Sequence, residues 1–492
     1  MNPAIAATEP RSLWSHFATI LTLPRPSKHE ERIVRWIRDW SADHGFECKS
    51  DETGNLVVRV PGSPGHEDAP TVILQSHLDM VCEKNGDTGH DFHKDPIPAI
   101  IDGDWVVTEG TTLGADNGIG VAASMAAAVD ETVVHGPLEL LFTVDEETGL
   151  TGAAGLDGSL LSGRLLLNLD SEDEGILYIG CAGGADSLLQ SDSERVAPAD
   201  DDVTITVDVR GLRGGHSGMD ICDNRGNAII LLSRSLRSLD EAEIPWALHT
   251  LTGGGLSNAI PREASAAIAV HRDRAADAIR CMEAAAVALR EQYAGPEKDW
   301  SVICSGASAC THPDVLTDAD RRRLMSLLLA LPNGVLAMSR EIPGLVETSN
   351  NVAIVRVEGP QMEAVASSRS SLESARDGVL QQIASCADLA GFGVALTDSY
   401  PGWQPDLDSQ ALAVLRDVYT ELSNGDTPAV TAVHAGLECG LLAERIPGVA
   451  MVSFGPTIRH AHSPDERVSI PSVARFWEAL RRALHRFGKT ES

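Results

Sequence analysis

The amino-acid sequence predicts an α/β protein in which one discontinuous domain is interrupted by a second, inserted α+β domain. Strand-like apolar runs alternate with helix-like segments at the start of the chain, a different pattern follows a polar connector, and the first pattern returns near the end. The chain has 492 residues, whereas single hydrophobic cores stop growing near about 250–300 residues. Two domains are therefore expected.

The first part of the chain is typical of a sheet with helices on its faces. Apolar runs predict strands over 55–60, 71–75, 138–144 and 165–169, and a segment with helical character covers 117–129. Strands that alternate with helices usually share one sheet. The polar stretch Ser191–Asp202, with Pro198 and three consecutive aspartates, then predicts a connector and the first domain boundary.

The middle of the chain has the pattern of an α+β domain. Its predicted strands are 203–209, 264–271, 351–358 and 393–396, and its predicted helices are 225–239, 275–293 and 370–386. The end returns to the first style, with helices over 409–422 and near 473–485 and an apolar run over 449–454. We expect residues 1–190 and 401–492 to form one domain and residues 191–400 to form the inserted one.

Charge and composition exclude several classes of function. The chain holds 71 acidic and 39 basic residues, and the resulting net charge of -32 repels nucleic acids and anionic membrane surfaces. No secretory signal and no run of 18 apolar residues is visible. The nine cysteines are scattered and form no C-x-x-C pair, which is typical of reduced thiols. The sequence thus indicates a cytoplasmic protein with neither a nucleic-acid nor a membrane partner.

Acidic and imidazole side chains gather where the predicted strands end. His77 and Asp79 follow the run 71–75, Glu146 and Glu147 follow 138–144, Asp170 follows 165–169, Asp116 opens the helix 117–129, and His462 comes eight residues after the run 449–454. Loops at the carboxyl ends of strands converge on one crevice in open α/β sheets. These residues therefore indicate one common site.

The kinds of side chain indicate what this site binds. Two imidazoles and several carboxylates, without a cysteine, suit divalent ions such as zinc, cobalt or manganese better than a thiolate site would. One central carboxylate can bridge two such ions about 3.5–4 Å apart, which is the spacing of hydrolytic two-metal sites. We assign the bridging role to Asp116.

Each of these residues also has an ordinary structural explanation. A single histidine after a strand is more often a hydrogen-bonded polar residue than a metal ligand. Asp116 could cap its helix, and Asp170 could begin a solvated acidic loop. The triplet Asp145-Glu146-Glu147 is harder to explain in this way, because three adjacent carboxylates repel one another unless cations or protons offset their charge. The triplet therefore favours a functional site.

Several spaced motifs resemble those of the M20 metallopeptidases over nearly the whole chain. The motifs are Ser76-His77-Leu78-Asp79-Met80-Val81, Thr112-Leu113-Gly114-Ala115-Asp116-Asn117-Gly118, Asp145-Glu146-Glu147-Thr148-Gly149, Asn168-Leu169-Asp170, Gly215-His216-Ser217-Gly218 and His462-Ser463-Pro464-Asp465-Glu466. With Asp170 at this position, the chain resembles the dipeptidase branch of the family, because several other relatives have a glutamate there. The resemblance implies a zinc-peptidase-like catalytic domain with a mixed sheet and flanking helices, and an inserted lid domain.

The resemblance also implies a set of metal ligands. His77 and Asp170 would bind one metal ion, Glu147 and His462 would bind the other, and Asp116 would bridge them. Both would be divalent ions, with zinc expected and cobalt or manganese as alternatives. His460 is a near competitor of His462, but the Ser-Pro-Asp-Glu that follows His462 fits the motif better.

Further roles are implied around the metals. Asp79 would accept the ring N–H of His77 and so fix its tautomer. Glu146 would be the general base, and His216 is a candidate donor to the oxyanion of the tetrahedral intermediate. The remaining residues match positions that the family uses around substrate: Asn258, Arg369 and Gly436.

The implied activity is the hydrolysis of unblocked dipeptides, including Xaa-His, by a metal-activated water. Alternatives are an aminoacylase or other amide hydrolase of the same superfamily, and a non-catalytic metal-dependent binding protein. Phosphate or nucleotide binding at 113–120 is excluded because this glycine-rich stretch lacks the Gly-Lys-Ser/Thr of a P-loop.

Small peptides are the partners that the implied activity predicts. The inserted domain could pair two chains into a homodimer, and a hinge near residues 190 and 400 is expected to gate turnover.

Overall fold

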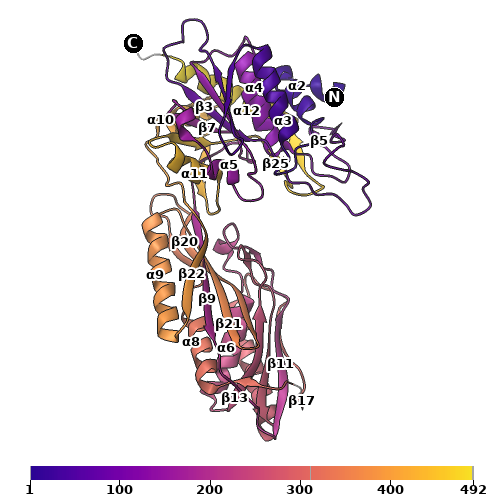
Figure 1. Ribbon diagram of the computed structural model, residues 1–492, viewed down its shortest axis with the longest axis vertical. Coiled ribbons are helices and arrows are strands. Elements are labelled where there is room, and N and C mark those ends of the chain that lie inside the picture. The colour runs from indigo at the N-terminus through magenta and orange to yellow at the C-terminus, as the bar shows by residue number, and fades with distance from the viewer. Residues whose placement is uncertain (1, 311, 490–492) are drawn as a thin grey trace. The chain divides into compact units, whose positions relative to one another are not determined.

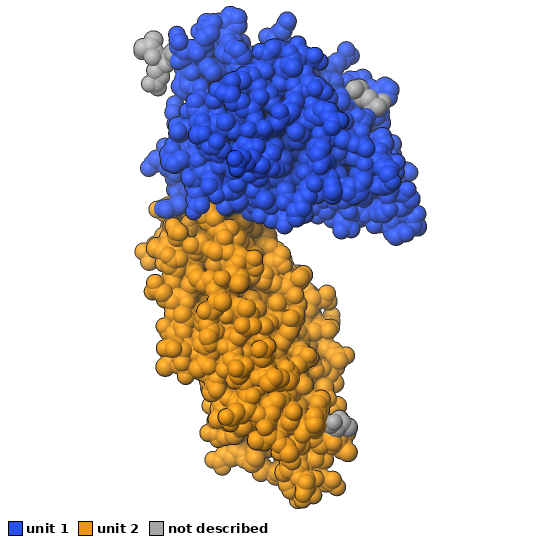
Figure 2. Space-filling model, viewed as in Figure 1, with its two compact units in different colours: residues 1–181, 403–432, 437–492 blue, residues 182–402, 433–436 orange. Residues whose placement is uncertain are grey.

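The structure, a computed structural model, describes residues 2–310 and 312–489 and divides into two compact units, coloured blue and orange in Figure 2. Unit 1 comprises Met1–Cys181, Trp403–Ala432 and Leu437–Ser492, and unit 2 comprises Ala182–Gly402 and Val433–Gly436. Unit 1 is therefore discontinuous in sequence. The chain passes from unit 1 to unit 2 after Cys181 and returns after Gly402, whereas the sequence predicts these boundaries near residues 190 and 400.

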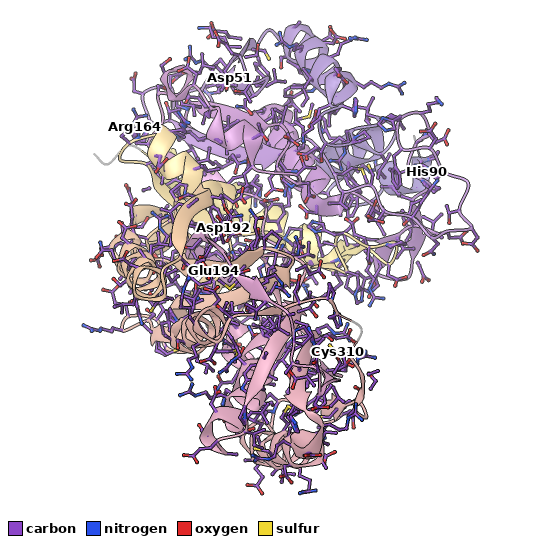
Figure 3. The ribbon with its side chains drawn as sticks, turned by 60° about the horizontal axis from the view of Figure 1, so that its bottom comes forward. Asp51, His90, Arg164, Asp192, Glu194 and Cys310 are labelled. Carbon is purple, nitrogen blue, oxygen red and sulfur yellow. The ribbon has the colours of Figure 1, made fainter. Side chains whose placement is uncertain are left out.

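The polar stretch Ser191–Asp202 is not the connector that the sequence suggests. Strand β9 (Gly183–Asp192) runs into it and pairs with β21 (Gln361–Ser370) and β22 (Gly393–Tyr400). Asp192 and Glu194, both labelled in Figure 3, belong to unit 2. The first half of β9 is buried while its end is largely exposed, so a strand of the sheet ends in polar residues that look like a linker in the sequence.

Unit 1 is built on an eight-stranded mixed sheet in the order β1-β2-β6-β3-β7-β24-β8-β23. Strand β3 runs parallel to β6 and β7, and β7 runs parallel to β24, whereas β2 pairs antiparallel with β6. Every residue of β3 and β6 is buried, which explains why both look like largely apolar runs in the sequence. The strands are β1 Glu47–Ser50, β2 Leu56–Val60, β3 Val72–His77, β6 Leu138–Thr143, β7 Leu165–Asn168, β8 Ile176–Cys181, β23 Ala429–Val433 and β24 Ala450–Ser453.

Helices pack against this sheet (Figure 1). α4 (Ala115–Val129), which is rich in alanine, is buried along most of its length and contacts β3 and β6, while α10 (Gln410–Leu422) contacts β7, β8 and β24. α12 (Ile470–Phe487) buries one face, as amphipathic helices do. The other helices are α1 Pro3–Ala6, α2 Arg11–Ile20, α3 Glu31–Asp43, α5 Thr151–Ala154, η1 Gly158–Leu160 and α11 Glu438–Arg445, and a small sheet joins β4 Ile100–Asp102, β5 Trp105–Val107, β25 Ile458–Arg459 and β26 Arg467–Ser469.

Unit 2 is an α+β domain with a ten-stranded antiparallel sheet, whose main path is β16-β11-β15-β13-β20-β21-β9-β22. Its helices and sheet share one hydrophobic core, which includes Leu232, Leu248, Ile268 and Leu328. Its further strands are β10 Arg195–Val196, β11 Asp202–Arg210, β12 Gly215–His216, β13 Trp246–Gly253, β14 Ala259–Ile260, β15 Ala264–His271, β16 Ser301–Cys304, β17 Ser308–Ala309, β18 Val315–Leu316, β19 Gly334–Met338 and β20 Val346–Glu358. Its helices are α6 Ala228–Glu241, α7 Ala275–Gln292, α8 Asp318–Ala330, α9 Glu373–Ala390, η2 Ile221–Asp223 and η3 Arg272–Arg274.

Two expectations from composition concern the whole chain. Among residues 2–310 and 312–489, no helix is long and apolar enough to cross a membrane. All nine cysteines are free thiols; Cys310, labelled in Figure 3, is one of them and belongs to unit 2. The absence of disulfides agrees with their scattered positions in the sequence.

Candidate metal centre

His77, the last residue of β3, is buried beside two carboxylates. Its Nε2 lies 3.0 Å from Oδ1 of Asp116 and 3.3 Å from Oδ1 of Asp170. Since β3 and β7 are parallel neighbours, His77 and the loop that carries Asp170 emerge at the same edge of the sheet. One ring nitrogen and two carboxylates thus converge beyond the ends of these strands.

Asp116 faces a second histidine with its other oxygen. Its Oδ2 lies 3.2 Å from Nε2 of His462, which is also 3.1 Å from Oε2 of Glu147. His462 has a φ of 62°, a left-handed conformation that is uncommon for residues other than glycine and that clusters at functional sites. Asp116 therefore stands between the two histidines with one oxygen toward each, which is the arrangement that a bridging ligand needs.

Three groups of these side chains could hold a metal ion, since the candidate ligand atoms within each group lie within 4.8 Å of one another. Oε1 of Glu147 is buried and has no hydrogen-bond partner among the described residues, as expected of an atom whose partner is a cation. Imidazole nitrogens and carboxylate oxygens suit zinc, cobalt or manganese. The groups are His77 with Asp116 and Asp170, His77 with Glu146 and Glu147, and Asp116 with Glu147 and His462. His460, the competitor of His462, is exposed and is in none of them.

The ionisation of these groups reflects their crowding. Hydrogen bonds with Asp116 and Glu147 raise the pKa of His462 to about 11. Burial acts to raise the pKa of Asp116, but hydrogen bonds from His462 and His77 outweigh it and hold that pKa below its usual range. The carboxylates thus keep positive charge on the imidazoles, and a divalent cation would replace those protons.

Asp79 links the first histidine to the glutamate pair. Its Oδ1 lies 3.4 Å from Nδ1 of His77 and accepts the backbone N–H of Glu146 at 3.0 Å, while its Oδ2 accepts the backbone N–H of Glu147 at 3.2 Å and the hydroxyl of Ser27 at 2.7 Å. An N–H of His77 at Nδ1 leaves Nε2 free to bind a metal. Asp79 is therefore placed to orient both a ligand and the loop that carries the candidate base.

The three adjacent acids that follow β6 have different surroundings. Asp145 accepts hydrogen bonds from the hydroxyls of Thr148 and Thr151, the latter at 2.6 Å. Glu147 contacts His462, and burial raises the pKa of Glu146 well above its usual range. The repulsion expected within the triplet is thus relieved by hydroxyl donors at Asp145 and by the metal-site imidazoles beyond it.

Glu466, which the sequence motif contains without an assigned role, holds the loop that carries Asp116. Its carboxylate is buried and accepts four consecutive backbone N–H groups, from Leu113, Gly114, Ala115 and Asp116, at 2.7 to 3.3 Å. An anion at this position satisfies donors that the first turn of α4 leaves unpaired. Arg25 supports the same loop from another direction, donating to the carbonyls of Gly114, Leu78 and Asp79 at 2.5 to 2.9 Å.

Replacing Glu466 with alanine is expected to leave these backbone donors without their acceptor, because the carboxylate is buried. We expect the free energy of unfolding to fall by about 3 kcal/mol, since a buried unpaired donor costs about 1–3 kcal/mol, and metal affinity to fall by about 10–100-fold. Denaturant unfolding of the metal-free protein and metal titration measure the two effects separately. Asp465→Ala, which changes the exposed neighbour, is the control; equal effects of the two substitutions would contradict the role of Glu466.

Comparison with known proteins decides the family. Residues 73–486 match the model of peptidase family M20/M25/M40. This chain is a member of that family. It is 44% identical to the cytosol non-specific dipeptidase of Escherichia coli (strain K12) over 482 residues, which cover 98% of each chain.

Solved structures of two peptidases share the fold. The crystal structure of aminoacylhistidine dipeptidase from Vibrio alginolyticus has a TM-score of 0.91 and 42% identity, with 98% of each chain covered. Aminopeptidase PepT from Bacillus cereus has a TM-score of 0.56 and 16% identity, covering 98% of this chain and 100% of its own, and so shows a similar fold only. The resemblance to M20 peptidases and the predicted α/β fold with an inserted domain are confirmed.

In unit 2 of this M20 peptidase, His216 has a defined tautomer. The backbone N–H groups of Gly218 and Met219 donate to its Nδ1 at 3.1 and 3.0 Å, so the hydrogen of the neutral ring is on Nε2. Burial and the charge of Arg369 lower the pKa of His216, which favours the neutral ring. His216 thus offers an N–H donor, the group that its predicted role requires.

The three residues predicted to contact substrate, Asn258, Arg369 and Gly436, lie near Ser217 or Tyr400. Arg369 donates from Nη1 to the Tyr400 hydroxyl at 2.6 Å and from Nε to the Ser217 hydroxyl at 3.4 Å. The N–H of Ser217 donates to the carbonyl of Asn258 at 2.8 Å. Gly436 approaches the Tyr400 ring so closely that a Cβ there would lie 2.9 Å from a ring carbon. Unit 2 therefore gathers these residues around Ser217 and Tyr400, two residues for which the sequence predicted no role.

Proposed function

We propose that this peptidase hydrolyses the peptide bond of unblocked dipeptides, Xaa-His among them, at a centre of two divalent cations. The observation that carries the proposal is Asp116, whose Oδ1 lies 3.0 Å from Nε2 of His77 and whose Oδ2 lies 3.2 Å from Nε2 of His462. Similarity to two proteins named as dipeptidases, at 44% and 42% identity, supports the class of substrate.

The ligands are proposed from the contacts of unit 1. His77 and Asp170 hold one cation, Glu147 and His462 hold the other, and Asp116 holds both. We propose zinc, with cobalt or manganese as alternatives, because the donors are imidazoles and carboxylates. When bound, such ions lower the pKa of a coordinated water to about 7 and polarise the substrate carbonyl.

The chain's own residues then move the protons. Glu146 takes a proton from the attacking water and delivers it to the leaving amine, a role that requires a carboxylate next to the metals that is not itself needed as a ligand. Its neighbour Glu147 binds instead. Asp79 positions both, since it accepts the backbone N–H of each and faces Nδ1 of His77.

Unit 2 is proposed to supply the substrate contacts. The Nε2–H of His216 donates to the oxyanion of the tetrahedral intermediate. Arg369 binds the substrate carboxylate, because a planar guanidinium can form two parallel hydrogen bonds to it. Asn258 and Gly436 contact the rest of the dipeptide. The last three assignments are supported by the contacts of Arg369 and Asn258 with Ser217 and of Arg369 and Gly436 with Tyr400.

A comparison of substrates tests the function. The purified protein should hydrolyse Ala-His and Gly-Leu, lose this activity after treatment with a chelator, and regain it with Zn²⁺, Co²⁺ or Mn²⁺. An N-acetyl amino acid should not be cleaved, since the proposed substrate has a free amine. Faster cleavage of the N-acetyl amino acid than of either dipeptide would instead favour the aminoacylase alternative.

We also propose that the protein acts in the cytoplasm. The proposal is supported by the name of the Escherichia coli relative, a cytosol dipeptidase, and by the nine free thiols.

A further inference from the structure

Glu438, the first residue of α11, is a buried carboxyl that the mechanism does not use. Its side chain is 1% exposed, and its Oε2 accepts hydrogen bonds from Nε2 of Gln75 at 2.7 Å and from the hydroxyl of Thr143 at 2.8 Å. Its Oε1 has no hydrogen-bond partner among the described residues. Glu438 therefore binds two side chains that come from different strands of the unit 1 sheet.

The same network reaches a third strand. Nδ2 of Asn168 donates to Oε1 of Gln75 at 2.5 Å, so Gln75 connects Asn168 to Glu438. Gln75 lies on β3, Thr143 ends β6 and Asn168 ends β7, and these strands are neighbours in the order β6-β3-β7. This network thus links the ends of three adjacent parallel strands, two of them through direct contacts of Glu438 and the third through Gln75.

Each of these strands leads into the metal centre within a few residues. Gln75 precedes His77 by two positions and so lies on the same face of β3. Thr143 precedes Glu146 by three positions, and Asn168 precedes Asp170 by two. A shift of any one strand end against its neighbours would therefore change the spacing between candidate ligands.

The energetics of Glu438 argue against a role in stability alone. Burial raises the pKa of its carboxyl to about 7, and one of its oxygens is left without a donor. Burial of a polar group costs free energy unless the group is fully hydrogen-bonded. Glu438 contacts the ends of β3 and β6 directly and the end of β7 through Gln75, so its burial is better explained by the candidate ligands that follow these strands.

We propose that Glu438 is a positioning residue of the metal centre, which acts through Gln75 and Thr143 to fix the ends of β3, β6 and β7. His77, Glu146, Glu147 and Asp170 then meet at the spacing that two cations require. The expected effect on catalysis rests on the proposed function, whereas the expected effect on metal binding does not.

Titration of the metal-free protein with Co²⁺, followed by its visible absorption, tests the proposal together with kcat and KM for Ala-His. Glu438→Ala should weaken Co²⁺ binding by about 10–100-fold, change the absorption spectrum, and lower kcat more than it raises KM. Glu438→Gln should recover part of the affinity, since its amide oxygen can still accept from Gln75 and Thr143. The matched control is Glu444→Ala, an exposed glutamate on the same helix, which should bind Co²⁺ as the wild type does.

A double-mutant cycle checks the route of the effect. If Glu438 acts in part through Gln75, the loss of Co²⁺ affinity in the variant carrying both Gln75→Ala and Glu438→Ala should be smaller than the sum of the losses in the two single variants. Wild-type Co²⁺ affinity and spectrum in Glu438→Ala would overturn the proposal, even if its unfolding temperature fell, and so would additive effects in the cycle.

Two further outcomes remain decisive. Should Glu438→Ala fail to fold, Gln75→Ala and Thr143→Val take its place, and wild-type Co²⁺ affinity in both would overturn the proposal. Should the wild type bind Co²⁺ but cleave no dipeptide, the proposed function fails, while the Co²⁺ titrations still decide the role of Glu438.

Discussion

Replacing Glu146 with alanine is expected to lower kcat for dipeptide hydrolysis by about 10²–10⁴-fold, the contribution that a positioned general base typically makes. Both cations should remain bound, because Glu146 is absent from the two ligand groups that share Asp116. KM should change little, since Glu146 transfers protons during the reaction and is not among the residues proposed to bind the dipeptide. Steady-state kinetics and elemental analysis of the purified variant measure the two effects.

The neighbouring residues provide the controls for this substitution. Glu147→Ala should lose metal as well as activity, because Glu147 contacts His462 and has a buried oxygen without a hydrogen-bond partner among the described residues. Glu52→Ala, at an exposed position of unit 1, should behave as the wild type. Unchanged turnover in Glu146→Ala would reject the general base, and loss of metal in that variant would make Glu146 a ligand.

Replacing Asp116 with alanine is expected to lower the metal content more than replacing Glu146 does. Both cations should be lost at micromolar metal, since Asp116 lies between His77 and His462 with one carboxylate oxygen close to each. Activity should become undetectable and should not return at metal concentrations that restore the chelated wild type. Metal content after gel filtration and turnover across a Zn²⁺ series measure these outcomes.

Asp116→Asn separates charge from shape at the same position. An amide keeps the size of the side chain but supplies one oxygen and no charge, so it should bind metal more weakly than aspartate. Asp87→Asn, at an exposed site, is the matched control and should retain both metal and activity. Retention of one cation by Asp116→Ala at wild-type affinity would show that Asp116 serves only one metal.

The candidate ligands could be predicted from sequence because their signals are local. The apolar runs of β3, β6 and β7 stop where polar residues begin, and His77, Glu146 and Asp170 lie at or just after those ends. The sequence also carries a local helix signal outside the elements predicted from it. In α3, Ile33, Ile37 and Trp40 recur at helical spacing, and all three are buried.

The supporting roles of Glu466 and Glu438 could not be predicted, because their partners are far away in sequence. Glu466 accepts from backbone groups 350 to 353 residues earlier, and Gln75 is 363 residues from Glu438. Neither hydrophobic periodicity nor turn chemistry carries information over such separations. For the same reason the sequence gives no sign that His434 lies 2.8 Å from Ser349, or that Val433–Gly436 joins unit 2.

The contact between Glu466 and the amides of Leu113 to Asp116 also bears on synthesis of the protein. A ribosome that has made residues 1–420 has supplied the whole of the continuous stretch Ala182–Gly402, but neither His462 nor the carboxylate that holds the Asp116 loop. Domains fold as units while the chain emerges. The full set of proposed ligands is therefore available only after the whole of the continuous stretch Ala182–Gly402 has been synthesised.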